Sequence, residues 1–100
     1  MAKTVRISRR AARDVEKITD YLFEKWGSKV VDDFVKRYNE CFDLLANNPE
    51  LYHIVQSDKQ IRRCILTQHN VVYFRAFSNK ITILTVFDTR QNPKKLNKII

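Results

Sequence analysis

Apolar side chains recur at steps of three and four residues over the first quarter of the chain. The repeat consists of Ala12, Val15, Ile18, Leu22 and Trp26. Steps of this size place side chains on one face of a helix. Ser8 stands where an N-cap residue would lie, and Gly27 stands where a C-cap glycine would end the helix. The pattern therefore predicts an amphipathic helix of about five turns between these two residues.

The same spacing continues after Gly27. The apolar positions are now Val31, Phe34, Tyr38, Cys41 and Leu45. Ser28 is a suitable N-cap for this second helix, and residues 47–49 (Asn-Asn-Pro) end it, because the residue before proline disfavours helix. Two amphipathic helices joined by so short a turn predict an antiparallel helical hairpin.

Residues rich in β-branched and aromatic types dominate three stretches of the second half, residues 61–66, 71–77 and 81–87. Short polar breaks separate them and suit hairpin turns, which favours an antiparallel meander. The last stretch is almost wholly apolar and predicts a central strand that is covered on both faces. Val5 and Ile7 alternate with polar residues and predict one more short strand before the first helix.

The predicted fold class is α+β with the order β-α-α-β-β-β, in which a helical hairpin packs on a small, mainly antiparallel sheet. At 100 residues, 44% of them hydrophobic, residues 1–100 should form a single domain with a small core. Residues 88–100 are basic and polar and include Pro93. We therefore expect them to form a mobile basic tail.

Aromatic side chains follow the predicted hairpin at helical spacing. They are Tyr21, Trp26, Phe34, Tyr38 and Phe42. Aromatic residues beside basic ones can stack on nucleobases, but at this spacing they usually belong to a core. We interpret the series as core residues.

Positive charge is concentrated in the second half of this basic protein. The net charge is +8, and residues 51–100 carry nine basic and two acidic side chains. Such a field attracts polyanions, which include nucleic acid, the ribosome and acidic protein segments. The alternative is a basic surface that is simply solvated.

Few residues suggest metal or cofactor chemistry. Cys41 and Cys64 lack the spacing of metal ligands and are interpreted as two reduced core thiols. His53, in a predicted loop, and His69, in a predicted turn, are interpreted as surface residues. We expect neither a metal site nor a cofactor. Neither a span of about 20 apolar residues nor a secretory signal is recognisable, so a cytoplasmic protein without membrane contact is expected.

Several segments, taken together, resemble the RelE/ParE family of bacterial toxins. The first predicted strand and helix carry the family pattern "A..DL..I..Y....WG" as Ile7-Ser8, Ala12, Asp14-Val15, Ile18, Tyr21 and Trp26-Gly27. Phe34 and residues 44–49 (LLANNP) are similar to its second helix and terminator. Residues 61–63 and 70–75 resemble its middle strands, and residues 83–90 resemble its last strand, which ends in arginine. The resemblance covers residues 4–96.

The resemblance implies the β-α-α-β-β-β fold and a toxin of a type II toxin–antitoxin system, a class associated with plasmid stabilization. Such a toxin inhibits growth until a cognate antitoxin protein binds it. RelE-like members cut messenger RNA on the ribosome, and ParE-like members poison DNA gyrase. Neither activity uses a small-molecule cofactor.

Cleavage of RNA would need cations around the scissile phosphate, and the catalytic candidates are Arg62, Arg63 and Arg90. Because Arg62 and Arg63 are neighbours on a strand, they must point to opposite faces, and the sequence leaves open which one faces the open side. The RelE-like pattern places a tyrosine after the last-strand arginine and an arginine before the third-strand tyrosine. This chain has no tyrosine after Arg90, and it has Asn70 at the second position. These departures favour the ParE-like activity.

The ParE-like interpretation requires a binding surface rather than a catalytic site. The candidate binding residues are Arg62, Arg63, Tyr73, Arg75, Arg90, Lys94 and Lys95. We expect the antitoxin to cover part of the apolar or basic sheet face by strand addition, and an exposed hydrophobic groove on the chain would be the sign of such docking. A non-toxic basic nucleic-acid-binding domain is the alternative from a different functional class.

Overall fold

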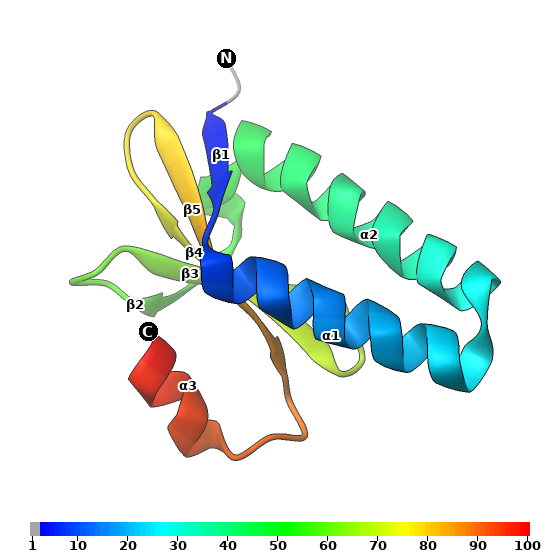
Figure 1. The fold of residues 1–100 in the computed structure, drawn as a ribbon. Helices are drawn as coiled ribbons and strands as arrows, with labels where there is room; N and C mark the ends of the chain where they lie inside the picture. Colours follow the sequence, from blue (N-terminus) through cyan, green and yellow to red (C-terminus); the bar gives the residue numbers. More distant parts are fainter. Residues whose placement is uncertain (1–2) are drawn as a thin grey trace.

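The computed structural model describes residues 3–100 and contains a helical hairpin, a five-stranded sheet and a short C-terminal helix (Figure 1). The elements in chain order are β1 (Thr4–Ile7), α1 (Arg9–Trp26), α2 (Ser28–Asn47), the 3-10 helix η1 (Pro49–Leu51), β2 (His53–Gln56), β3 (Ile61–Thr67), β4 (Asn70–Ala76), β5 (Lys80–Asp88) and α3 (Pro93–Ile99). The predicted α+β class and the predicted β-α-α-β-β-β order are confirmed, with β2 and α3 as additions.

The ends of α1 follow from the two residues identified in the sequence. The Ser8 hydroxyl accepts a hydrogen bond from the Ala11 N–H at 3.0 Å, and it donates one to the Leu84 carbonyl of β5 at 2.9 Å. At the other end the Gly27 N–H donates to the Phe23 carbonyl at 2.9 Å, and Gly27 has φ +90°. This left-handed conformation turns the chain so sharply that Ser28 is already the first residue of α2. Ser28 is therefore not the N-cap that the sequence predicted.

The sheet has the strand order β1-β5-β4-β3-β2. β1 pairs with β5 in parallel, and the three other pairs are antiparallel. β2 was not predicted, and His53 is its first residue rather than part of a loop. The strand has four residues and an irregularity between Ile54 and Gln56, so it is too short for alternation to be visible. It exists because it pairs with β3.

Buried residues form a cluster on each face of the sheet. The cluster under the helical hairpin includes Phe34, Leu45, Phe74 and Ile83. The cluster on the opposite face consists of Ile61, Val71, Tyr73 and Phe87, and the side chains of Leu96, Ile99 and Ile100 pack against it. Because β5 lies between β1 and β4 and supplies residues to both clusters, the prediction of a doubly covered last strand is confirmed.

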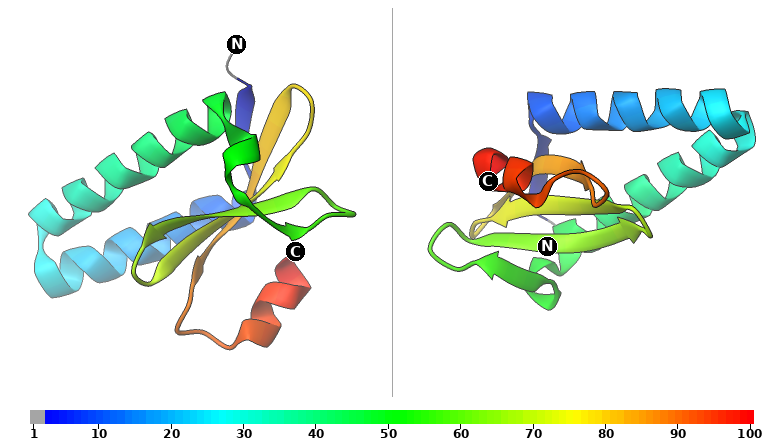
Figure 2. Two further views of the ribbon diagram at one scale, coloured as in Figure 1. Left: turned by 180° about the vertical axis from the view of Figure 1, so that it is seen from behind. Right: turned by 90° about the horizontal axis from the view of Figure 1, so that it is seen from below.

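The C-terminal segment is not the mobile tail that was expected, because residues 93–99 form α3 (Figure 2). This helix packs on the face of the sheet opposite the helical hairpin, which we call the open face. Pro93 occupies the start of the helix, and the Asn92 side chain accepts a hydrogen bond from the Lys94 N–H at 3.0 Å. Leu96 and Ile99 are spaced to share one face of the helix. Their burial against the sheet outweighs the basic composition that suggested a tail.

The helical hairpin extends beyond the edge of the sheet (Figure 1). A helix of 20 residues such as α2 is about 30 Å long, whereas a strand of seven residues such as β3 spans about 23 Å. Phe34 and Tyr38 lie above the sheet and are 3% and 9% exposed, but Tyr21 and Trp26 near the tip are 44% and 67% exposed. The prediction that the whole aromatic series belongs to the core is therefore wrong at Tyr21 and Trp26.

Candidate functional site

A groove of about 720 Å³ lies between the two helices of the hairpin and the nearby end of the sheet. We call it the hairpin groove. Helix α1 contributes Asp14, Lys17, Ile18, Tyr21, Leu22 and Trp26, and α2 contributes Val30, Asp33, Phe34 and Arg37. The sheet end contributes Thr67, His69, Asn70, Val86, Asp88, Arg90 and Gln91. Apolar side chains from both helices thus stand opposite polar residues from the strand ends.

Two of the most exposed aromatic side chains of the chain line this groove. Trp26 is the last residue of α1 and is 67% exposed, and Tyr21 is 44% exposed. The Lys25 ammonium lies 5.8 Å from the centre of the Tyr21 ring. Aromatic side chains that are exposed beside a concave apolar surface commonly anchor protein partners. The groove is therefore suited to bind an apolar segment of another protein.

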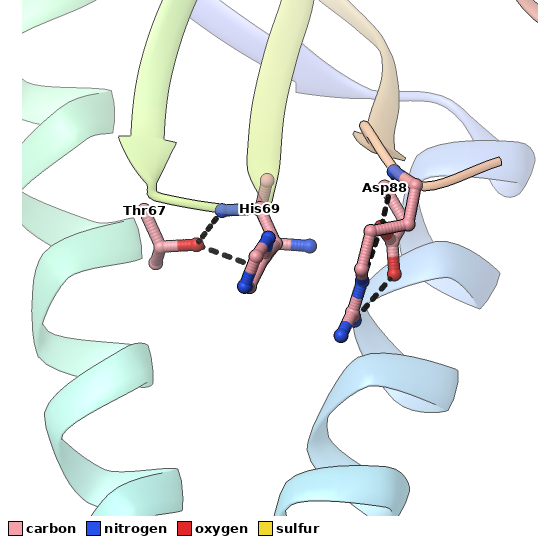
Figure 3. A network of polar contacts seen from close by, with 5 residues as sticks. Thr67, His69 and Asp88 are labelled. Atoms are coloured by element: carbon pink, nitrogen blue, oxygen red, sulfur yellow. Dashed lines mark hydrogen bonds and ion pairs between the residues drawn. The ribbon is translucent and has the colours of Figure 1, made fainter. Parts of the chain in front are cut away.

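The turn between β3 and β4 is fixed by its own side chains (Figure 3). The Thr67 hydroxyl donates to Asn70 Oδ1 at 2.7 Å and accepts from the His69 N–H at 3.2 Å. The Thr89 N–H donates to the His69 carbonyl at 2.8 Å, so the turn is also tied to the segment after β5. These bonds place His69 at the wall of the hairpin groove, in the predicted turn.

Asp88 and Arg90 form a two-pronged ion pair at the same wall (Figure 3). Arg90 Nε lies 3.0 Å from Asp88 Oδ1 and Nη2 lies 2.8 Å from Oδ2, while the Arg90 N–H donates to Oδ1 at 2.9 Å. The hydrogen bonds from Arg90 hold the pKa of Asp88 below its ordinary value. Since the Arg90 side chain is 54% exposed, it remains accessible to solvent in this ion pair.

Asp14 attaches α1 to β5 beside the groove. Its carboxylate accepts hydrogen bonds from the Thr85 hydroxyl and, at 3.1 Å, from the Val86 N–H of β5. A charged acceptor that satisfies a backbone donor is a strong anchor. The position of Asp14 in the family pattern thus has a structural explanation, because it fixes the wall that carries Tyr21 and Trp26.

The side chains of Arg62 and Arg63 lie on different faces of the sheet, and the structure shows which arginine lies on which face. Cys64 belongs to the cluster under the helices, so Arg62 shares that side, while Arg63 lies with Ile61 on the open side. Arg62 Nη1 donates to the Tyr52 carbonyl at 2.7 Å and to the Glu50 carbonyl at 3.4 Å. Its guanidinium thus helps to hold the segment before β2 and lines a separate groove of about 330 Å³.

Three of the predicted binding residues share the open face. Arg63 is paired with Tyr73, and Ile61 with Arg75, so the two arginines are diagonal neighbours across β3 and β4. Arg63 is exposed, and the Arg75 guanidinium lies 5.9 Å from the centre of the Phe77 ring. Tyr73 is 7% exposed and packs edge-on against Phe87.

Lys94 and Lys95 are exposed on α3, the helix that covers this open face. The predicted site residues therefore lie in three places. Arg62 lines the small groove, Arg90 lines the hairpin groove, and the others lie on or next to the open face. The structure does not gather the three arginines proposed for catalysis into one site.

Helix α3 packs on the open face, so the apolar part of the sheet face on which the sequence placed an antitoxin segment is already covered within the chain. The hairpin groove was missed. A signal for it did exist: Trp26 ends a helix that is longer than the predicted strands, next to the turn at Gly27.

Within residues 3–100, no cluster of three or more His, Cys, Asp and Glu side chains could hold a metal ion. In the same range no helix is long and apolar enough to cross a membrane.

Comparison with known proteins finds a consistent set of relatives. Residues 5–93 match the family model described as the ParE toxin of the type II toxin–antitoxin system parDE. The chain is similar to Toxin ParE1 of Caulobacter vibrioides, with 27% identity over 96 residues, which are 92% of this chain and 95% of that protein.

Two solved structures share the fold. The chromosomal ParDE system from P. aeruginosa superposes with a TM-score of 0.73 at 19% identity, covering 87% of this chain and 96% of that one. The YoeB dimer from Staphylococcus aureus superposes with a TM-score of 0.62 at 15% identity, covering 87% of this chain and 97% of that one.

Proposed function

This chain belongs to the ParE family of type II toxin–antitoxin toxins, and from this premise we propose that it inhibits DNA gyrase and is neutralised by a cognate antitoxin. The observation that carries the proposal is the match of residues 5–93 to the ParE model, because gyrase is the target that the ParE-like branch implies. The similarity to Toxin ParE1 over nearly the whole chain supports the same branch.

The antitoxin is proposed to bind in the hairpin groove. Its lining combines apolar side chains with three basic and three acidic ones (Lys17, Arg37 and Arg90; Asp14, Asp33 and Asp88), which suits an apolar segment flanked by charged residues of either sign. Trp26 and Tyr21 would lose most of their exposed surface in such a complex, and buried aromatic anchors of this kind contribute most to affinity.

The gyrase-binding surface is proposed to lie on the opposite side, around α3. Lys94 and Lys95 on α3 and Arg63 on β3 are exposed, and Arg75 lies next to Arg63 across the strand pair. A group of cations attracts an acidic or nucleic-acid surface by charge. Gyrase acts on DNA, so an enzyme–DNA complex offers such a surface.

Expression in cells tests the proposal. The chain alone should stop growth and relax or linearise a reporter plasmid while messages stay intact, and coexpression of the antitoxin encoded beside it should restore growth. Cleavage of messenger RNA at codon positions, lost in Arg62→Ala or Arg90→Ala, would instead establish a ribosome-dependent endonuclease. Unchanged growth with soluble protein would refute the toxin activity itself.

Two variants, one double and one single, separate the two proposed surfaces. Lys94→Ala with Lys95→Ala should reduce toxicity but keep antitoxin binding, because both side chains lie away from the groove. Trp26→Ala should leave toxicity unchanged but weaken neutralisation. If both variants lose the same function, the assignment of the two surfaces is wrong.

A further inference from the structure

Two cysteine side chains from different layers of the fold touch each other in the core. Cys41 of α2 and Cys64 of β3 have their Sγ atoms 3.3 Å apart, with the Cys41 thiol donating to Cys64. Both are free thiols, and they are 4% and 8% exposed. The predicted core location of these thiols is therefore confirmed, but the sequence did not predict that they meet.

The two sulfur atoms differ in their surroundings. The pKa of the Cys64 thiol is lowered, chiefly by the hydrogen bond from Cys41 and further by one from the Tyr52 hydroxyl, while burial opposes the shift. The pKa of the Cys41 thiol is raised by its hydrogen bond with Cys64 and by burial. The contact therefore favours a thiolate on Cys64 and keeps the proton on Cys41.

We propose that Cys41 and Cys64 are an oxidation site at which hydrogen peroxide forms an intramolecular disulfide between α2 and β3. The sulfur atoms need to approach by about 1.3 Å from their 3.3 Å contact to reach the bond length of about 2.05 Å. This modification is independent of the proposed action on gyrase.

The reaction has two balanced steps. The Cys64 thiolate attacks one peroxide oxygen, the O–O bond breaks, and hydroxide leaves and takes up a proton, so that Cys64 becomes a sulfenic acid. The Cys41 sulfur then attacks the Cys64 sulfur, the S–O bond breaks, and the hydroxyl leaves as water with the Cys41 proton. In sum, two thiols lose two electrons and two protons, and one peroxide becomes two water molecules.

The disulfide would fix the helical hairpin on the sheet. Cys41 lies about one helical turn beyond Arg37, which lines the hairpin groove, so the bridge would attach that wall to β3. Closing the loop between residues 41 and 64 restricts the unfolded chain. The oxidised protein should therefore melt roughly 10 °C higher than the reduced protein.

The test is to treat the purified full-length chain with hydrogen peroxide, block remaining thiols under denaturing conditions and measure its mass. The expected product is a monomer that has lost two hydrogen atoms, takes up no alkylating agent and regains both thiols with dithiothreitol. Thiols that stay alkylatable, or a disulfide between two chains, would overturn the proposal. Because this readout uses the unmodified chain, it does not depend on the folding of any variant.

Two single variants test the separate roles. In Cys41→Ser, the sulfenic acid should persist at Cys64 and be trapped by dimedone, because no second thiol can attack it. In Cys64→Ser, oxidation of Cys41 should be slower by about tenfold or more, because burial still disfavours its thiolate after the thiol of Cys64 is removed. Equal oxidation rates in the two variants would contradict the assignment of Cys64 as the attacking thiolate.

Discussion

The two ends of the helical hairpin carry the same apolar periodicity but have opposite environments. At the end that lies above the sheet, Cys41 and Leu45 are 4% and 0% exposed. At the tip, Trp26 is 67% exposed although it continues the same stripe. The periodicity thus predicts which face of a helix is apolar, but the length of the sheet decides how much of that face is covered. The uncovered part is the hairpin groove.

The largest loss of stability is expected from a substitution at the covered end of the hairpin. Leu45→Ala should lower the free energy of unfolding by about 2–5 kcal/mol, because it leaves a cavity among close-packed residues. Leu44→Ala is the matched control, since Leu44 is 55% exposed and its replacement should cost about 0.5 kcal/mol or less. Urea denaturation measures both values. Similar losses in the two variants would show that the covered end is not tightly packed.

Trp26→Ala tests the uncovered end. We expect the affinity for the antitoxin to fall by about 30-fold or more, as for an aromatic anchor, while thermal unfolding changes little. Phe23→Ala is the control, because Phe23 is 62% exposed on the same helix but does not line the groove. Calorimetric titration with purified antitoxin measures the difference. An equal loss of affinity in both variants would contradict docking in the groove.

The burial of Tyr38 at the covered end can be tested through the dependence of stability on pH. Burial, with smaller contributions from Cys41 and Asp14, raises its pKa to about 12. Because the unfolded tyrosine ionises near pH 10, the folded protein should lose roughly 2 kcal/mol of stability as the pH rises from 10 to 12. Urea denaturation at several pH values should show a shallower decline in Tyr38→Phe. The same decline in both proteins would mean that Tyr38 titrates normally.

The smallest effect is expected at the exposed pair of Asp88 and Arg90. Its contribution to stability is present above the ordinary carboxyl pKa and is lost as the pH falls through the lowered pKa of folded Asp88. Arg90→Ala should return the pKa of Asp88 towards its ordinary value, whereas Arg90→Lys should return it only in part. Carboxyl chemical shifts followed by NMR measure this. An unchanged pKa in Arg90→Ala would assign the shift to another group.

Much of the fold could be predicted from local signals. Ser8 and Gly27 have side-chain and backbone properties that define helix ends, and the polar breaks between β-branched stretches locate the turns of the meander. β2 and α3 were not predicted from the sequence, because both depend on contacts with other elements of the fold. β2 needs β3 beside it, and α3 needs the apolar open face to bury Leu96 and Ile99.

The candidate site was predictable only in part. Arg90 was identified as a candidate, and it lines the hairpin groove. Strand geometry alone predicts that Arg62 and Arg63 point to opposite faces of the sheet. It does not predict that Arg62 donates to the Tyr52 carbonyl, because that contact depends on how η1 and β2 pack beside β3. The groove itself depends on the relative lengths of two layers, a property of the assembled fold that no single segment contains.

A supercoiling assay with purified DNA gyrase, relaxed plasmid and increasing amounts of the chain tests the proposed inhibition of gyrase. We expect supercoiling to be lost as the chain is added and to be restored by stoichiometric antitoxin, and we expect Trp26→Ala to inhibit equally but to be poorly neutralised. Full supercoiling at a large excess of a chain that still stops growth in cells would contradict gyrase as the target.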